Sequence, residues 1–195
     1  MSAQSMDRPT VLVVIDMQSG FQASTSQWCV PRYDEVVPVI EALGASITGP
    51  TVFTRFIANP QDQQGAWQAY YQRWDEMSLP EDAPEWDITM DVPPGSETIS
   101  KTTFSKWGPE LAALVPAGAE MVLTGVATDC CVLSTALGAV DAGRYVTVVA
   151  DACAAVSDEA QVQTLALLEL LSPMVRVVTS ADFLARDTSR ESATA

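Results

Sequence analysis

Short runs of apolar and β-branched residues alternate with segments of helical periodicity along this chain. The first run, Thr10–Asp16, is apolar until its final aspartate, which is typical of a strand covered on both faces. Similar runs follow at Pro50–Phe56, Glu97–Lys101, Glu120–Val126, Tyr145–Ala150 and Met174–Val178. The alternation predicts right-handed crossovers and an α/β, three-layer, Rossmann-like fold. We expect about six strands in a mostly parallel sheet, with helices on both faces.

The predicted helices cover Tyr33–Leu43, Gln64–Trp74, Cys130–Ala142 and Asp158–Leu171. The segment 57–92 is unusual, because it is rich in proline, tryptophan and tyrosine. It is interpreted either as a cap over a substrate pocket or as ordinary packing at a subunit interface. A length of 195 residues fits one domain over 1–195, with frayed tails at about 1–8 and 187–195.

Composition excludes several kinds of site and partner. The chain has no histidine, which rules out Ser-His-Asp and Cys-His nucleophilic systems and histidine-ligated zinc. With 25 acidic and 10 basic residues, its net charge is −15, so a phosphate backbone or an anionic bilayer would be repelled. We therefore expect neither nucleic acid nor membrane as a partner.

The four cysteines, Cys29, Cys130, Cys131 and Cys153, form no CxxC pair. The first residues contain no apolar signal region, and no apolar run approaches the ~20 residues of a membrane span. Reduced thiols in a cytoplasm are the simplest interpretation, and we expect a cytoplasmic protein.

Reactive side chains follow three of the predicted strands, and ligands of open parallel sheets bind at the carboxyl ends of strands. Asp16 ends the first run, Lys101 ends the third, and Cys131 follows the fourth in the first turn of a helix. The helix dipole and the lysine are expected to lower the pKa of the thiol. Asp16 can take the thiol proton and pass it to a leaving amine. Taken singly, a capping aspartate, a solvated lysine and a buried structural cysteine remain open alternatives.

Four segments resemble the isochorismatase-like cysteine hydrolase superfamily, which includes nicotinamidases, N-carbamoylsarcosine amidases, ureidoacrylate amidases and isochorismatases. They are VLVVIDMQSGF (11–21), SKTTFSKW (100–107), LTGVATDCCVLSTALGAVDAG (123–143) and ADACAAVSDEA (150–160). The resemblance implies that Asp16 is the catalytic acid and base, Lys101 the catalytic lysine and Cys131 the nucleophile. Cys130, one residue earlier, is not the matching position.

The resemblance also implies details of the turn before the nucleophile. A non-proline cis peptide is expected between Val126 and Ala127. It would aim the amide of Ala127, together with that of Cys131, at the substrate oxygen as an oxyanion hole. Phe21 and Trp107 occupy positions where the family places pocket walls, and core packing is the alternative for Trp107.

The chain departs from the nicotinamidases after the second strand, where those enzymes bind a metal through an aspartate and histidines. The corresponding stretch, TVFTRFIANPQDQQ (51–64), has no histidine, so we expect no metal and no cofactor. Arg55 in this stretch is a candidate for binding a substrate carboxylate, or it forms a structural salt bridge.

Because Cys131 is present, the favoured function is cysteine-dependent hydrolysis of a C–N bond through a thioester, in a small amide, carbamoyl or ureido substrate. An isochorismatase-type enol-ether hydrolase and a catalytically inactive binding relative remain alternatives. Relatives suggest a homo-oligomer, a dimer or larger.

Overall fold

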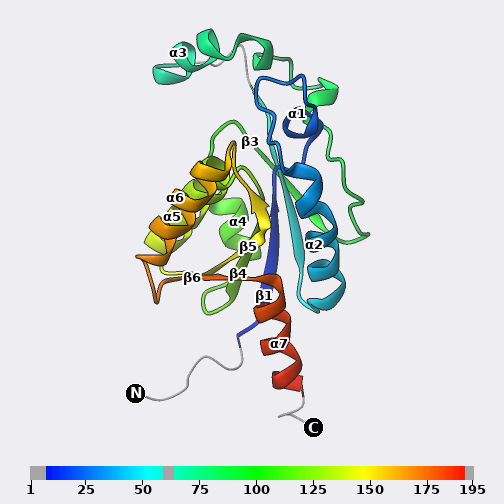
Figure 1. Ribbon diagram of the computed structural model, residues 1–195, viewed down its shortest axis with the longest axis vertical. Helices are drawn as coiled ribbons and strands as arrows, with labels where there is room; N and C mark the ends of the chain where they lie inside the picture. Colours follow the sequence, from blue (N-terminus) through cyan, green and yellow to red (C-terminus); the bar gives the residue numbers. More distant parts are fainter. Residues whose placement is uncertain (1–7, 59–63, 192–195) are drawn as a thin grey trace.

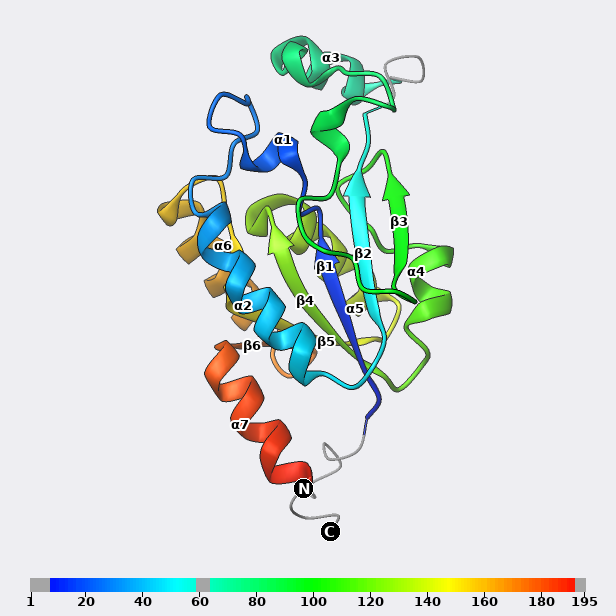
Figure 2. The same ribbon diagram turned by 90° about the vertical axis from the view of Figure 1, so that its right-hand side faces the viewer.

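The centre of the molecule is a six-stranded parallel sheet with the strand order β3-β2-β1-β4-β5-β6 (Figures 1 and 2). The computed structural model describes residues 8–58 and 64–191. The strands are β1 (Thr10–Ile15), β2 (Thr51–Phe56), β3 (Glu97–Lys101), β4 (Glu120–Val126), β5 (Tyr145–Ala154) and β6 (Val175–Val178). Each neighbouring pair is parallel. The predicted Rossmann-like fold is confirmed.

Helices cover both faces of the sheet because its central strands are apolar on both sides. All seven residues of β4 are buried, as expected for a strand between two helical layers. In Figure 1, α5 and α6 lie on one face and α2 on the other. The helices and helical turns are α1 (Ser19–Gln22), α2 (Tyr33–Ser46), α3 (Ala66–Arg73), η1 (Asp75–Met77), η2 (Pro84–Trp86), α4 (Pro109–Leu114), η3 (Thr128–Val132), α5 (Leu133–Asp141), α6 (Asp158–Glu169) and α7 (Ser180–Glu191).

A close approach of β1 and β4 fixes the position of Asp16, the first of the reactive side chains. Ile15 pairs with Gly125, and a Cβ atom on Gly125 would lie 2.1 Å from the carbonyl oxygen of Ile15. Gly125 also has a φ of +102°, a conformation that side chains rarely tolerate. Glycine is therefore required there, immediately beside the point where β1 delivers Asp16.

The tails and the unusual segment differ in part from expectation. Residues 187–191 continue α7, where a frayed tail was expected, while residues 1–7 and 192–195 lie outside the described residues. The predicted helix at 64–74 is present as α3, and Figures 1 and 2 place it beyond the carboxyl ends of the strands. Residues 59–63 of the same segment are not described. In the described part of the chain, no helix is both long and apolar enough to cross a membrane.

Candidate active site

Asp16 is held rigidly at the end of β1. Its side chain is fully buried, and its φ of 49° lies in the left-handed region, which is uncommon outside glycine and is found at functional sites. The Thr54 hydroxyl on β2 donates to Asp16 Oδ1 at 2.6 Å and accepts the Asp16 backbone N–H at 3.2 Å. One carboxylate oxygen is thus fixed, and Oδ2 is directed toward a second group.

That second group is the ammonium of Lys106. Its Nζ lies 3.0 Å from Asp16 Oδ2, and both side chains are 0% exposed. Nζ also donates to the carbonyl of Thr103 at 2.9 Å, and the backbone N–H of Lys106 donates to Thr135 Oγ1 at 2.8 Å. The Phe56 ring centroid is 4.7 Å from Nζ, within cation–π range. A buried ion pair with this many partners is a fixed feature of the fold.

The lysine assignment made from sequence is corrected here. Lys101 ends β3 as predicted, but its Nζ pairs with the carboxylate of Glu110 on α4, a side chain that is 61% exposed. The loop after β3 turns back toward the sheet, so that Lys106, five residues later, enters the site instead. These are the chain's two lysines, and the structure brings Lys106, not Lys101, to Asp16.

Cys131 lies in the turn η3 directly after β4 and is 2% exposed. Its hydrogen bond with the Cys130 side chain, burial and the charge of Asp16 all raise the pKa of its thiol, while the charge of Lys106 lowers it. The net direction is well above the usual value. The expected net lowering of the thiol pKa is therefore wrong, although the charge of Lys106 does act in the lowering direction. Cys131 nevertheless interacts electrostatically with both members of the ion pair.

The turn before Cys131 has the geometry that the family resemblance implied. The peptide bond between Val126 and Ala127 is cis. The backbone N–H groups of Cys130 and Val132 both donate to the Ala127 carbonyl, at 3.0 and 3.2 Å. The role of the Ala127 and Cys131 amides as oxyanion donors stays a prediction.

The structure places the three predicted substrate-binding residues in different surroundings. Arg55 points away from the face of β2 that carries Thr54, and its Nε donates to Ser100 Oγ on β3 at 3.1 Å. Trp107 packs against Gly138 of α5 and lies 5.3 Å from the guanidinium of Arg144, which precedes β5. Their assignment to a substrate pocket stays a prediction.

Phe21, by contrast, belongs to a group of rings that adjoins the site, which we call the aromatic cluster. Its members come from α1, β2, α3, η2 and the loops beside them: Phe21, Trp28, Phe56, Trp67, Tyr70, Tyr71, Trp86 and Phe104. Phe56 contacts Lys106. Burial first, and then electrostatic interactions with Cys130 and Cys131, raise the pKa of Tyr70.

Sequence reasoning missed Thr54, Lys106 and Tyr70. Thr54 could have been found from register, because the carboxyl end of β2 lies beside that of β1. Tyr70 comes from a segment whose path over the sheet no periodicity predicts.

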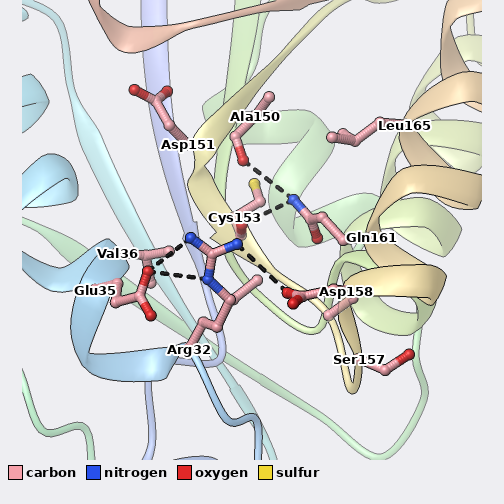
Figure 3. A pocket seen from close by; sticks show the side chains of 12 residues that line it. Arg32, Glu35, Val36, Ala150, Asp151, Cys153, Ser157, Asp158, Gln161 and Leu165 are labelled. Carbon is pink, nitrogen blue, oxygen red and sulfur yellow. Dashed lines mark hydrogen bonds and ion pairs between the residues drawn. The ribbon is translucent and has the colours of Figure 1, made fainter.

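A cavity of about 420 Å³ lies apart from these groups, between α2, β5 and α6 (Figure 3). Arg32 lies between Glu35, at 2.7 Å, and Asp158, at 3.4 Å. Gln161 Nε2 donates to the carbonyls of Ala150 and Cys153. Asp16, Lys106 and Cys131 do not line this cavity. Cys131, Asp16 and Lys106 lie apart from this cavity, and we place the candidate chemistry with them.

The donor set does not suit a catalytic metal. The chain has no histidine. Among residues 8–58 and 64–191, no group of three or more cysteine, aspartate or glutamate side chains could hold a metal ion. Asp16, the carboxylate of the site, is already committed to Thr54 and Lys106.

The fold of this chain is similar to the folds of several proteins of known structure. The structure is similar to that of a cysteine hydrolase from Pseudomonas syringae pv. phaseolicola 1448A, with a TM-score of 0.81, 21% identity, and coverage of 97% of this chain and 100% of that one. An isochorismatase family protein from Desulfovibrio vulgaris subsp. vulgaris str. Hildenborough gives a TM-score of 0.79 and 22% identity, covering 92% and 100%. Pyrazinamidase of Pyrococcus horikoshii, solved in complex with zinc, gives 0.70 and 23%, covering 88% and 99%.

At these identities the structural likeness shows a shared fold. No curated protein matches the chain. A family model described as the isochorismatase domain, however, matches residues 10–182, which is most of the chain. The protein therefore belongs to the isochorismatase family of hydrolases.

Proposed function

We propose that the protein is a cysteine-dependent amidohydrolase that cleaves a C–N bond in a small amide, carbamoyl or ureido substrate. The observation that carries this proposal is the fully buried Asp16–Lys106 ion pair, with Oδ2 and Nζ 3.0 Å apart, beside the thiol of Cys131. A nucleophile, a proton acceptor and a fixed cation are the groups that acyl transfer through a thioester needs.

The first step is attack by Cys131 Sγ on the substrate carbonyl carbon. Because the pKa of the thiol is raised, the proposed mechanism removes the thiol proton as the S–C bond forms. Asp16 accepts that proton, while the Thr54 hydroxyl holds its other oxygen in place. General-base assistance of this kind contributes about 10²–10⁴-fold to a rate.

Charge develops on the substrate oxygen in the resulting tetrahedral intermediate. The backbone N–H groups of Ala127 and Cys131 stabilise it in this proposal, and preorganised donors in a buried site are worth far more than donors in water. Lys106 keeps the carboxyl group of Asp16 in position. When the intermediate collapses, the C–N bond breaks, and Asp16 returns its proton to the departing nitrogen.

A water molecule completes the cycle by attacking the thioester carbonyl. Asp16 takes a proton from that water, the C–S bond breaks, and the proton returns to Cys131 Sγ. The products are ammonia or an amine and the corresponding acid, and the enzyme returns to its thiol form.

Two observations bear on the substrate. The buried site favours a small molecule, because Asp16, Lys106 and Cys131 are each at most 2% exposed. The aromatic cluster beside the site favours an apolar or planar acyl group. Arg55 takes no part in this proposal, because it faces Ser100.

No step is routed through a metal. Pyrazinamidase of Pyrococcus horikoshii was solved in complex with zinc, but this chain has no histidine to offer. We expect activity to persist after dialysis against a strong chelator. Loss of activity that added zinc, iron or manganese restores would overturn this part of the proposal.

The direct test is a panel of small amides, carbamoyl compounds and ureides, assayed for release of ammonia. Intact-mass spectrometry after rapid acid quench should show one acyl group on the wild type and none on Cys131→Ala. Turnover of an enol ether by Cys131→Ala would instead support the isochorismatase-type reaction. Binding without turnover across the panel would support an inactive relative.

A further inference from the structure

Buried polar atoms that lack a hydrogen-bond partner gather at the candidate site and in the aromatic cluster. Within the described ranges, 8–58 and 64–191, four buried side chains carry such an atom, and they are Asp16, Trp28, Tyr71 and Thr128. Asp16 belongs to the candidate site, Thr128 to the turn that carries Cys131, and Trp28 and Tyr71 to the aromatic cluster. Tryptophan N–H and tyrosine O–H groups usually find a partner when they are buried, so each exception needs an explanation.

Trp28 and Tyr71 lie next to each other and near the ion pair. Their ring centroids are 6.2 Å apart. Trp28 meets Phe56 edge to face at 5.2 Å, and the Phe56 ring is 4.7 Å from Lys106 Nζ. Phe56 thus contacts both Trp28 and the cation of the site. Tyr71 lies on α3, which Figures 1 and 2 show beyond the carboxyl ends of the strands.

The two unpaired groups are hydrogen-bond donors. Trp28 Nε1–H can only donate. Burial raises the pKa of the Tyr71 hydroxyl, so that group keeps its proton at neutral pH. Phenylalanine at position 71 would fill nearly the same space without leaving a buried hydroxyl unpaired, which is costly. Tyr33 shows the usual arrangement, because its hydroxyl lies 2.7 Å from Thr89 Oγ1.

Building on the proposed function, we propose that Trp28 and Tyr71 bind the acyl group of the substrate through a second carbonyl oxygen. The first carbonyl is the one that Cys131 attacks. The second accepts hydrogen bonds from Trp28 Nε1–H and from the Tyr71 hydroxyl. The substrate class narrows accordingly to amides, carbamoyl compounds or ureides whose planar acyl group bears a further neutral carbonyl.

A neutral carbonyl suits these donors better than a carboxylate. A carbonyl oxygen has two lone pairs, so it can accept from both groups. A carboxylate buried without a cation is far more costly, and the nearby Lys106 is already paired with Asp16. The rings favour a planar group, since Phe21 stacks on Trp28 with centroids 5.7 Å apart and flat surfaces of this kind pack against planar ligands.

Matched pairs of aryl amides test the specificity. Acetylbenzamide and ethylbenzamide, substituted in the meta or the para position, differ by one carbonyl oxygen and have similar shapes. For at least one pair, the wild type should favour the acetyl amide about tenfold or more in kcat/KM. Tyr71→Phe should cut that preference about 3–10-fold and leave kcat/KM for the ethyl amide unchanged. Trp28→Phe should cut the preference by a similar factor, whatever its effect on both rates.

Tyr33→Phe is the matched control, because it removes a buried hydroxyl that has a partner. It should lower Tm and leave the acetyl preference as in the wild type. Tyr71→Phe should leave Tm unchanged or raise it. A fall in Tm as large as that of Tyr33→Phe would show that the Tyr71 hydroxyl is bonded in the resting protein, and would overturn the proposal. Equal slowing of both amides by Tyr71→Phe would overturn it as well.

Binding measurements separate this proposal from the proposed function. By calorimetry, Cys131→Ala should bind the favoured acetyl amide about 3–10-fold more tightly than its ethyl counterpart, and Cys131→Ala/Tyr71→Phe should lose most of that difference. Tighter binding of the acetyl amide without any ammonia release by the wild type would refute the amidohydrolase and support the binding role. Ammonia release with no acetyl preference in any pair would leave the amidohydrolase standing and overturn the binding role.

Discussion

Replacing Lys106 by methionine should cost both stability and activity. The variant leaves the carboxylate of Asp16 buried without its cation, because Nζ lies 3.0 Å from Oδ2 and both side chains are fully buried. Breaking a buried pair by removing one partner costs about 3–5 kcal/mol. For a chain of 195 residues, that corresponds to a fall in Tm of roughly 6–20 °C.

A second substitution separates folding from catalysis. In Asp16→Asn/Lys106→Met neither charge remains, and replacing both members of a buried pair is often neutral or stabilising. We expect the double variant to recover most of the lost Tm in thermal unfolding. Its ammonia release should nevertheless stay at background, because the proton acceptor is gone.

Lys101→Met is the matched control. Lys101 pairs with Glu110, which is mostly exposed, and such pairs contribute about 0–1 kcal/mol. Tm and kcat/KM should therefore stay close to wild type, whereas Lys106→Met should lose about 10²-fold or more in kcat/KM. If Lys101→Met is inactive and Lys106→Met keeps its activity and its Tm, the assignment of the site lysine made here is refuted.

Three further outcomes follow from the site. Cys131→Ala and Cys131→Ser should lack turnover, and activity in Cys131→Ala would exclude thioester catalysis. Cys130→Ala should keep most of its turnover, and its free energy of unfolding, measured by chemical denaturation, should fall by at most ~1–2 kcal/mol. At neutral pH, iodoacetamide should modify the partly exposed Cys130 and Cys29 before it modifies Cys131. Because the pKa of the Cys131 thiol is raised, peptide mapping should show that its labelling increases with pH. Gly125→Ala should destabilise the fold by several kcal/mol, about 3 or more, because its Cβ would meet the Ile15 backbone and its φ is positive; an unchanged Tm would contradict this.

The sheet could be predicted because its strands are nearly continuous apolar runs. Once the order of strands and helices is known, the positions of Asp16 and Cys131 follow, since one ends β1 and the other follows β4 directly. Neither placement depends on the course of a long loop. The carboxyl ends of β1 and β4 must lie side by side in a parallel sheet, and the structure pairs Ile15 with Gly125 there.

The lysine could not be placed in this way. Lys101 and Lys106 both lie near the end of β3, and the choice between them depends on the path of the loop that follows. That path is fixed by tertiary contacts, such as the hydrogen bond between the Lys106 amide and Thr135 on α5, which no local periodicity contains. The end of the chain was misread for a related reason. Residues after 186 are polar, but α7 is anchored upstream by Phe183, which is fully buried.

Charge conservation explains why a protonated thiol suits this site better than a preformed thiolate. With Cys131 as a thiol, Asp16 ionised and Lys106 charged, the buried groups sum to zero. A resting thiolate would leave one uncompensated negative charge in the interior, and the hydrogen bond with Cys130, burial and the charge of Asp16 all raise the thiol pKa. Transfer of the thiol proton to Asp16 keeps the sum at zero, so the nucleophile forms without any change in buried charge. In the proposed mechanism, the ion pair therefore allows the thiol proton to move to Asp16 at no cost in buried net charge.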